Sequence, residues 1–180
     1  MLGDSLGAAY GIDPAQGWVA LLDGRLAANG HPHRVVNASI SGDTTAGGLR
    51  RLPALLETHR PQLVLIELGG NDGLRGLPLA TVRANLAEMV RLAREVATSV
   101  VLIGVRMPPN YGPRYAEGFA AVYREVAAAE GAALVPALLA GVGERLDLMQ
   151  RDGIHPTAEA QPLIVDNVWP ALVPLLGASG

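Results

Sequence analysis

The chain has 180 residues and a formal net charge of −3; 49% of its residues are hydrophobic and 17% are charged. This balance excludes an intrinsically disordered chain, which would be poor in apolar residues. It also argues against a nucleic-acid-binding protein, which would carry a basic excess. All 14 basic residues are Arg and none of the residues is Cys, which excludes disulfides, a thiolate nucleophile, a Schiff-base lysine and a P-loop lysine.

Short apolar runs alternate along the chain with longer amphipathic stretches. Short runs rich in β-branched residues are typical of buried strands, and apolar residues three and four positions apart predict helices. In chain order we expect helix Trp18–Ala28, strand Arg34–Ile40, strand Gln62–Leu68, helix Leu79–Ala97, strand Ser99–Val105, helix Tyr115–Ala129, strand Ala132–Pro136 and helix Ala158–Leu176. The last helix contains Pro162, Pro170 and Pro174, which predicts a kink or a break.

Strand and helix alternation predicts an α/β fold with a mostly parallel sheet that helices cover on both faces. The sequence contains no linker or repeat, so we expect one domain over residues 1–180. In such sheets, functional sites form in loops after the carboxyl ends of strands. Candidate site residues should therefore follow the apolar runs.

One loop pair, Asp152 and His155, is the clearest candidate for catalysis. A carboxylate three residues away can reach one ring nitrogen, fix the tautomer and leave the other nitrogen as a base. Such a base can activate a serine hydroxyl, and Ser5, near the start of the chain, is the serine best placed for this. Taken alone, the same spacing also fits a turn with a solvated histidine.

Two further loops suit the binding of a developing oxyanion. The Asn71 carboxamide could donate to it, and Gly42 could offer a backbone N–H with no side chain in the way. On its own, Gly-Gly-Asn-Asp-Gly at 69–73 is also typical of a turn. The neighbouring acids Asp4 and Asp72 fit the role of loop-fixing carboxylates rather than catalysts.

The remaining histidines favour simpler interpretations. His31 and His33 flank Pro32 in a predicted loop and could bind a metal, although surface histidines are far more common in such loops. His59 lies just before Pro61, at a predicted helix end where a cation suits the helix dipole.

Taken together and in order, these segments resemble the four signature blocks of the SGNH (GDSL) hydrolase family. The matching blocks are Gly-Asp-Ser-Leu at Gly3–Leu6, the glycine at Gly42, Gly-x-Asn-Asp ending at Asp72, and Asp-x-x-His-Pro at Asp152–Pro156. The resemblance spans nearly the whole chain. It is closer still to the bacterial thioesterase I/protease I/lysophospholipase branch, also called arylesterases, in segments such as GDSLGAAYGI and MQRDGIHPTAEAQP.

The resemblance implies a role for each block. Ser5 would be the nucleophile, His155 the general base and acid, and Asp152 the orienting carboxylate. The backbone N–H groups of Ser5 and Gly42 and the side-chain amide of Asn71 would form the oxyanion hole. The family fold is a flavodoxin-like three-layer α/β/α sandwich with a mostly parallel sheet of about five strands, and it uses no metal or cofactor.

The resemblance also points to the substrate. The segments GLRGLP and MPPNY are similar to those that line the acyl pocket in this branch, so we expect acyl contacts from Leu74, Leu77, Pro109 and Tyr111. Only 4% of the residues are aromatic, which favours an aliphatic pocket. We expect an esterase, arylesterase, acyl-CoA thioesterase or lysophospholipase that cleaves short-to-medium acyl esters and thioesters. A carbohydrate acetyl esterase of the same family and a catalytically silent binding module remain alternatives.

The expected partner is a small-molecule acyl ester or thioester, without nucleic acid or stable membrane insertion, and composition does not predict the oligomeric state. Members of the branch are commonly exported, which implies a periplasmic or secreted location; no signal peptide is present, so a cytoplasmic location stays open. Relatives carry an apolar strand before Gly-Asp-Ser-Leu, whereas only Met1 and Leu2 precede it here. Either the chain is short by a few residues at this end or the sheet tolerates a short strand here, and we expect Met1–Gly3 to pair as a short strand end in the middle of the sheet.

Overall fold

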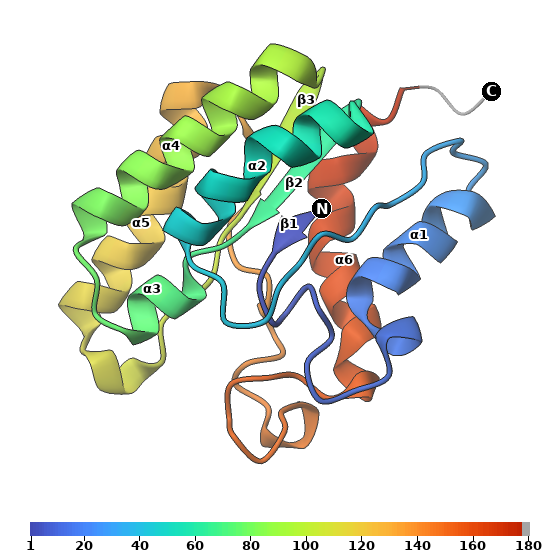
Figure 1. The fold of residues 1–180 in the computed structure, drawn as a ribbon. Coiled ribbons are helices and arrows are strands. Elements are labelled where there is room, and N and C mark those ends of the chain that lie inside the picture. The colour runs from blue at the N-terminus through green and yellow to red at the C-terminus, as the bar shows by residue number, and fades with distance from the viewer. Residues whose placement is uncertain (178–180) are drawn as a thin grey trace.

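Four parallel strands form a central sheet (Figure 1). The structure, a computed structural model, describes residues 1–177, with the side chain of Pro109 excepted. Every neighbouring pair of strands is parallel, so their carboxyl ends lie at the same edge of the sheet. The strands, in their order across the sheet, are β1 (Leu2–Gly3), β2 (Leu63–Glu67), β3 (Ser99–Ile103) and β4 (Ala133–Val135).

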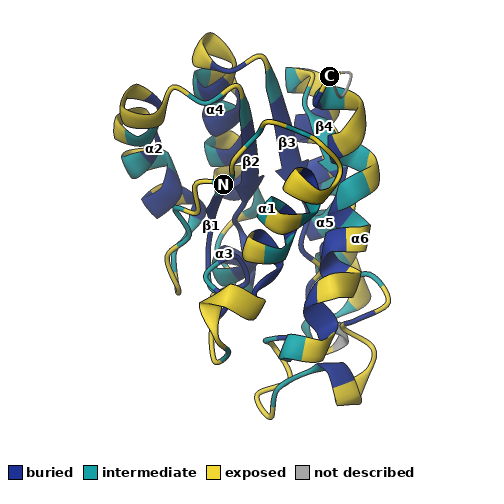
Figure 2. Cartoon of the chain, turned by 90° about the vertical axis from the view of Figure 1, so that its right-hand side faces the viewer, coloured by how far each residue is buried: buried dark blue, intermediate teal, exposed yellow. Residues whose placement is uncertain are grey.

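Helices cover both faces of this sheet and give it three layers (Figure 1). A short helix, α3 (Gly70–Leu74), follows β2 directly. Each covering helix packs apolar residues into the core and leaves an exposed outer side (Figure 2). One face carries α2 (Thr45–His59), α4 (Leu79–Val96) and α5 (Pro113–Glu130), and the other carries α1 (Trp18–Ala28) and α6 (Gln161–Leu172).

The strands feed two separate hydrophobic cores with alternate residues. In β3, Val100 and Leu102 pack under α2, α4 and α5, whereas Val101 and Ile103 pack under α1 and α6. A strand buried on both faces needs apolar residues at every position. This is why the central strands appear in the sequence as largely apolar runs, with the buried Glu67 at the end of β2 as the charged exception.

Three of the four predicted strands are confirmed, each slightly shorter than its apolar run. The prediction for Arg34–Ile40 is wrong, because this segment is extended but forms no strand. The N–H of Ala38 donates to the Met1 carbonyl (2.9 Å) and that of Ile40 to the Gly3 carbonyl (3.0 Å). Because β1 offers only two residues, no longer ladder forms beside it, and the sheet has four strands instead of about five.

The first residues of the chain are held in place. Strand β1 pairs with β2, with Leu2 opposite Ile66 and Gly3 opposite Glu67. The predicted pairing of this segment is confirmed, but its place in the sheet differs from the prediction. In the strand order β1 stands at the edge, and the extended segment 36–40 covers its outer side.

The predicted helices are confirmed, and they differ from the predictions mainly in where they begin and end. Helix α1 begins and ends at the predicted residues. The C-terminal helix breaks as its prolines require, into a 3₁₀ turn (Ala158–Ala160), α6 and a second 3₁₀ turn (Val173–Leu175). For helix α2 only the end near His59 was predicted; its extent was not, because Gly47, Gly48 and Pro53 interrupt its apolar pattern. None of the helices in residues 1–177 is both long and apolar enough to cross a bilayer.

Gly104, just after β3, gives a test of this packing. A Cβ there would lie 2.5 Å from the backbone carbonyl oxygen of Pro136, so we expect Gly104→Ala to lower the free energy of unfolding by about 1–3 kcal/mol. Gly24 of α1 is the matched control, because its Cβ would meet nothing within 4 Å. Gly24→Ala should stabilise the protein by about 0.5–1 kcal/mol. Urea denaturation of both variants measures these changes. Equal changes in the free energy of unfolding would contradict the close packing of Gly104 against Pro136.

Candidate active site

Ser5, His155 and Asp152 form a hydrogen-bonded chain at the carboxyl edge of the sheet. Ser5 Oγ lies 2.8 Å from His155 Nε2, and His155 Nδ1 lies 2.7 Å from Asp152 Oδ2. The fold therefore brings together residues from the two ends of the sequence. A hydroxyl that donates to an imidazole, which a carboxylate orients in turn, is the arrangement that supports nucleophilic acyl transfer.

The loop that carries Asp152 and His155 is shaped by its own hydrogen bonds. Asp152 Oδ1 accepts from the backbone N–H groups of Ile154 (2.9 Å) and His155 (3.0 Å). The N–H of Gln150 donates to the His155 carbonyl (2.7 Å), and the Gln150 side chain donates to the Tyr10 carbonyl (2.8 Å). These contacts fix the imidazole and attach its loop to the loop of Ser5.

The ionisation of Asp152 follows from these contacts. Burial acts to raise the pKa of its carboxyl, but hydrogen bonds from His155 and from the Ile154 N–H outweigh burial and lower the pKa to about 2. Asp152 is therefore a carboxylate throughout the neutral range. Its charge can stabilise the imidazolium that forms when His155 takes a proton.

Ser5 stands in a tight turn directly after β1. The Ala8 N–H donates to the Asp4 carbonyl (2.9 Å), and the Tyr10 N–H donates to the Ser5 carbonyl (3.1 Å). The Tyr10 ring lies 4.5 Å from the His155 ring, centroid to centroid, so it covers one side of the base. No spacing or motif in the sequence marks Tyr10 as a site residue.

The expected oxyanion donors line the same cleft as Ser5. Gly42 has a left-handed backbone (φ +80°), and nothing lies within 4 Å of where its Cβ would be. Asn71, in α3, donates from Nδ2 to the Asp43 carbonyl (2.9 Å) and to Asp4 Oδ2 (3.1 Å). Both amide hydrogens of Asn71 thus have acceptors in the free protein, and a bound oxyanion has to replace or share one of them.

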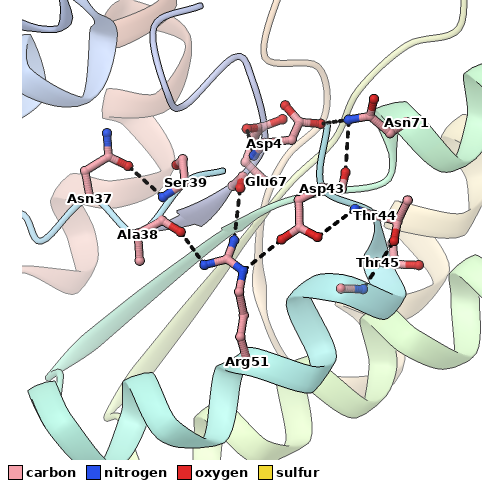
Figure 3. Close-up of polar contacts among 12 residues, drawn as sticks. Asp4, Asn37, Ala38, Ser39, Asp43, Thr44, Thr45, Arg51, Glu67 and Asn71 are labelled. Atoms are coloured by element: carbon pink, nitrogen blue, oxygen red, sulfur yellow. Dashed lines mark hydrogen bonds and ion pairs between the residues drawn. The ribbon is translucent and has the colours of Figure 1, made fainter. Parts of the chain in front are cut away.

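Arg51 of α2 holds the segment that carries Gly42 (Figure 3). Its Nε donates to Asp43 Oδ2 (2.8 Å), and its two other nitrogens donate to the carbonyls of Ala38 and Gly3. One guanidinium thus connects β1, the extended segment 36–40 and the loop that carries Gly42. Arg51 was not predicted from the sequence, where its only signal is its place just after the second block.

Asp72 lies beside Asn71 and does not point to the catalytic chain. It is fully buried, and its carboxylate accepts from the backbone N–H (2.9 Å) and the hydroxyl (2.6 Å) of Thr45. It therefore anchors α3 to the start of α2, as expected of a loop-fixing carboxylate.

A cleft of about 780 Å³ opens beside Ser5 and His155. Leu74 contributes to its wall, as predicted, together with apolar residues from the loops after β3 and β4 and from the loop before Asp152. Met107 and Pro108 belong to the segment MPPNY, which was predicted to line the acyl pocket. The other four, Val105, Ala137, Leu139 and Met149, were not predicted, although several of them follow predicted strands, where sites were expected.

Leu77 and Tyr111 are not among the described residues that line the cleft, so these two acyl contacts stay predictions from the resemblance. The Tyr111 hydroxyl donates to the Leu74 carbonyl (3.0 Å), so the ring supports the wall from behind. The Leu77 N–H donates to the Asp72 carbonyl (3.0 Å), which turns the chain away from the opening. The fourth predicted contact, the side chain of Pro109, lies outside the described part of the chain.

Other candidate sites lie away from this cleft. His31 and His33 have ring centroids 6.4 Å apart, and within residues 1–177 no three His, Asp or Glu side chains are grouped as metal ligands. His59 is the last residue of α2. A second cavity of about 370 Å³, lined by residues such as Leu22, Leu56 and Leu63, contains no member of the catalytic chain.

Several known proteins are similar to this chain in sequence. The sequence model of the GDSL-like lipase/acylhydrolase family matches residues 1–162. The chain is 60% identical over 176 residues to Esterase TesA of Pseudomonas aeruginosa, and the aligned residues cover 98% of this chain and 88% of the relative. It is 43% identical over 176 residues to thioesterase 1/protease 1/lysophospholipase L1 of Escherichia coli K12, covering 98% and 83%.

A solved structure extends the similarity to three dimensions. The psychrotrophic esterase EstA from Pseudoalteromonas sp., inhibited by monoethylphosphonate, superposes with a TM-score of 0.92 at 41% identity, covering 98% of this chain and 97% of that one. Sequence, fold and the four signature blocks agree, and the chain therefore belongs to the GDSL-like lipase/acylhydrolase family.

Proposed function

We propose that this member of the family hydrolyses carboxylic esters and thioesters through an acyl-enzyme on Ser5. The observation that carries the proposal is the chain from Ser5 Oγ through His155 to Asp152, at 2.8 and 2.7 Å, which opens on an apolar cleft. Relatives named as an esterase and a thioesterase support the same reaction class.

The reaction runs in two transfers of the acyl group. Ser5 Oγ attacks the carbonyl carbon while His155 Nε2 takes the hydroxyl proton, and the backbone N–H groups of Ser5 and Gly42 and the Asn71 amide stabilise the oxyanion. The bond to the leaving alcohol or thiol then breaks, and His155 returns the proton to it. Water attacks the acyl-serine in the same way, which releases the acid and restores Ser5.

The cleft favours a substrate with a short-to-medium acyl chain. Its walls are mainly aliphatic, and Tyr10 is the one aromatic side chain among its described lining residues. Sugar sites stack rings on aromatic side chains, whereas an alkyl chain gains about 0.8 kcal/mol for each buried CH₂. This lining therefore supports acyl esters over acetylated polysaccharides.

A chain-length series tests this substrate class. We expect kcat/KM to rise about threefold to fourfold for each methylene from p-nitrophenyl acetate upward, until the chain outgrows the cleft. Leu139→Ala, in the cleft wall, should flatten this rise, whereas Leu146→Ala, at a residue 87% exposed and outside the cleft, should not. Acyl-CoA thioesters of the same lengths should follow the ester series, and a preference for acetylated xylan would contradict the proposal.

A further inference from the structure

Two buried carboxyl groups, Asp4 and Glu67, lie behind the catalytic serine and take no part in the reaction described above. Asp4 is 2% exposed and Glu67 is fully buried. Glu67 ends β2 opposite Gly3, and its Oε2 accepts from the Asp4 backbone N–H at 3.3 Å. The two carboxyl groups also lie close enough together for each to shift the pKa of the other.

Such a pair shares one proton, because two adjacent buried carboxylates would repel each other. Burial raises the pKa of Asp4 to about 6, and burial together with the charge of Asp4 raises the pKa of Glu67 well above its ordinary value. In addition, Glu67 Oε1 is buried and accepts no hydrogen bond from any residue in 1–177, which would be costly for a carboxylate. The proton therefore resides on Glu67, and Asp4 is the carboxylate.

The Asp4 carboxylate contacts the groups that surround the nucleophile. Its Oδ1 accepts from the N–H of Leu6 (3.0 Å), the residue after Ser5, and its Oδ2 accepts from Asn71 Nδ2 (3.1 Å). A carboxylate only accepts hydrogen bonds, so it keeps the nitrogen of the Asn71 amide on its side. A protonated Asp4 could instead donate to the amide oxygen and allow the flipped amide.

We propose that Asp4 and Glu67 are positioning residues for the oxyanion-binding groups. Asp4 orients the Asn71 amide and the turn of Ser5, and Glu67 holds the shared proton so that Asp4 remains an acceptor. The inference rests on the proposed function, in which Asn71 donates to the oxyanion.

Asp4→Asn isolates the contact with Asn71. The new side chain can still accept from the Leu6 N–H, but it presents an N–H instead of an acceptor to Asn71. We expect kcat for a p-nitrophenyl ester to fall about 10- to 100-fold with little change in KM, a smaller loss than removal of a whole oxyanion donor. In the Asn71→Ala background the same substitution should cost less than about threefold, because residues that act through one another are not additive.

The two proposals fail in different ways in this cycle. If Asn71→Ala leaves kcat unchanged, the oxyanion role in the proposed function is wrong. If Asn71→Ala lowers kcat but Asp4→Asn costs the same in both backgrounds, the positioning role alone is wrong. A rise in KM at constant kcat would also overturn the positioning role.

Two substitutions of Glu67 test where the proton lies. Gln can donate to Asp4 as a protonated glutamate does, so Glu67→Gln should restore most of the kcat that Glu67→Met, without a donor, loses. If Glu67→Met does not fold, Glu67→Gln still decides the matter. A loss in Glu67→Gln as large as that in Asp4→Asn would mean that Glu67 acts as a carboxylate and would overturn the inference.

The pH dependence of kcat distinguishes the positioning role from a purely structural role, which would not make the effect of Asp4→Asn depend on pH. The charged and titratable groups around the pair are His155 across the cleft, Tyr123 and Asp72 behind it, and the Asp43–Arg51 ion pair beside β1. As the pH falls through about 6, Asp4 becomes protonated and ceases to accept. The ratio of wild-type kcat to Asp4→Asn kcat should therefore fall toward one as the pH is lowered from 8 to 5. A ratio independent of pH would contradict the inference.

Discussion

Ser5→Ala is expected to lower kcat for p-nitrophenyl ester hydrolysis by at least about 10⁴-fold. The substitution removes the oxygen that forms the acyl-enzyme, and water in its place lacks the same position and activation. The hydrogen bond to His155 is the one hydrogen bond of the Ser5 hydroxyl within the described residues. The free energy of unfolding should therefore change by no more than about 1 kcal/mol. Assays of p-nitrophenyl ester hydrolysis measure kcat, and urea denaturation of the same preparation measures the free energy of unfolding.

Ser39→Ala is the matched control for this experiment. The Ser39 hydroxyl is buried near the same strand and has no hydrogen-bond partner in the part of the chain that the structure describes, so its loss should leave kcat unchanged. A phosphonate that reacts with active-site serines should label the wild type and Ser39→Ala but not Ser5→Ala, as read by mass. Normal turnover in Ser5→Ala would refute the acyl-enzyme. A folded wild type that neither reacts with the phosphonate nor hydrolyses esters would favour the silent binding module.

The sequence predicts the parts of this fold that depend on burial. Strands β2 and β3 are buried on both faces, and this burial requires the largely apolar runs that mark them. The extended segment Arg34–Ile40 has the same β-branched composition, yet it has only the two residues of β1 to pair with. Composition reports what a segment could form, whereas pairing depends on a partner elsewhere in the chain.

The residues of the candidate site also fall into those that the sequence predicts and those that it does not. Ser5, Asp152 and His155 were expected from motifs, because their chemistry requires those side chains in short local patterns. Arg51 and Glu67 were not, because their roles come from contacts between segments that lie far apart in sequence. The acyl wall was predicted in part, since Leu74 lines the cleft while Tyr111 supports it from behind.

Asn71→Ala is expected to have the second largest effect on catalysis. Removal of one oxyanion donor costs about 10²- to 10³-fold in kcat, because the donor acts on charge that develops only in the transition state. The ground state gains little from the amide, whose hydrogens already have acceptors in Asp43 and Asp4. KM should therefore stay within about threefold of the wild-type value. Steady-state kinetics with a p-nitrophenyl ester measure both parameters.

Two further variants separate the donor role from the structural role of Asn71. Asn71→Asp keeps the size of the side chain but replaces the donor with a carboxylate near Asp4, so its kcat should fall at least as far as that of the alanine variant. Asn29→Ala removes an amide that bonds to the Arg25 carbonyl at the end of α1 and should leave kcat unchanged. Loss of the two Asn71 hydrogen bonds should lower the free energy of unfolding by about 1–3 kcal/mol. If kcat falls only in proportion to the unfolded fraction, Asn71 holds the loop together and does not bind the oxyanion.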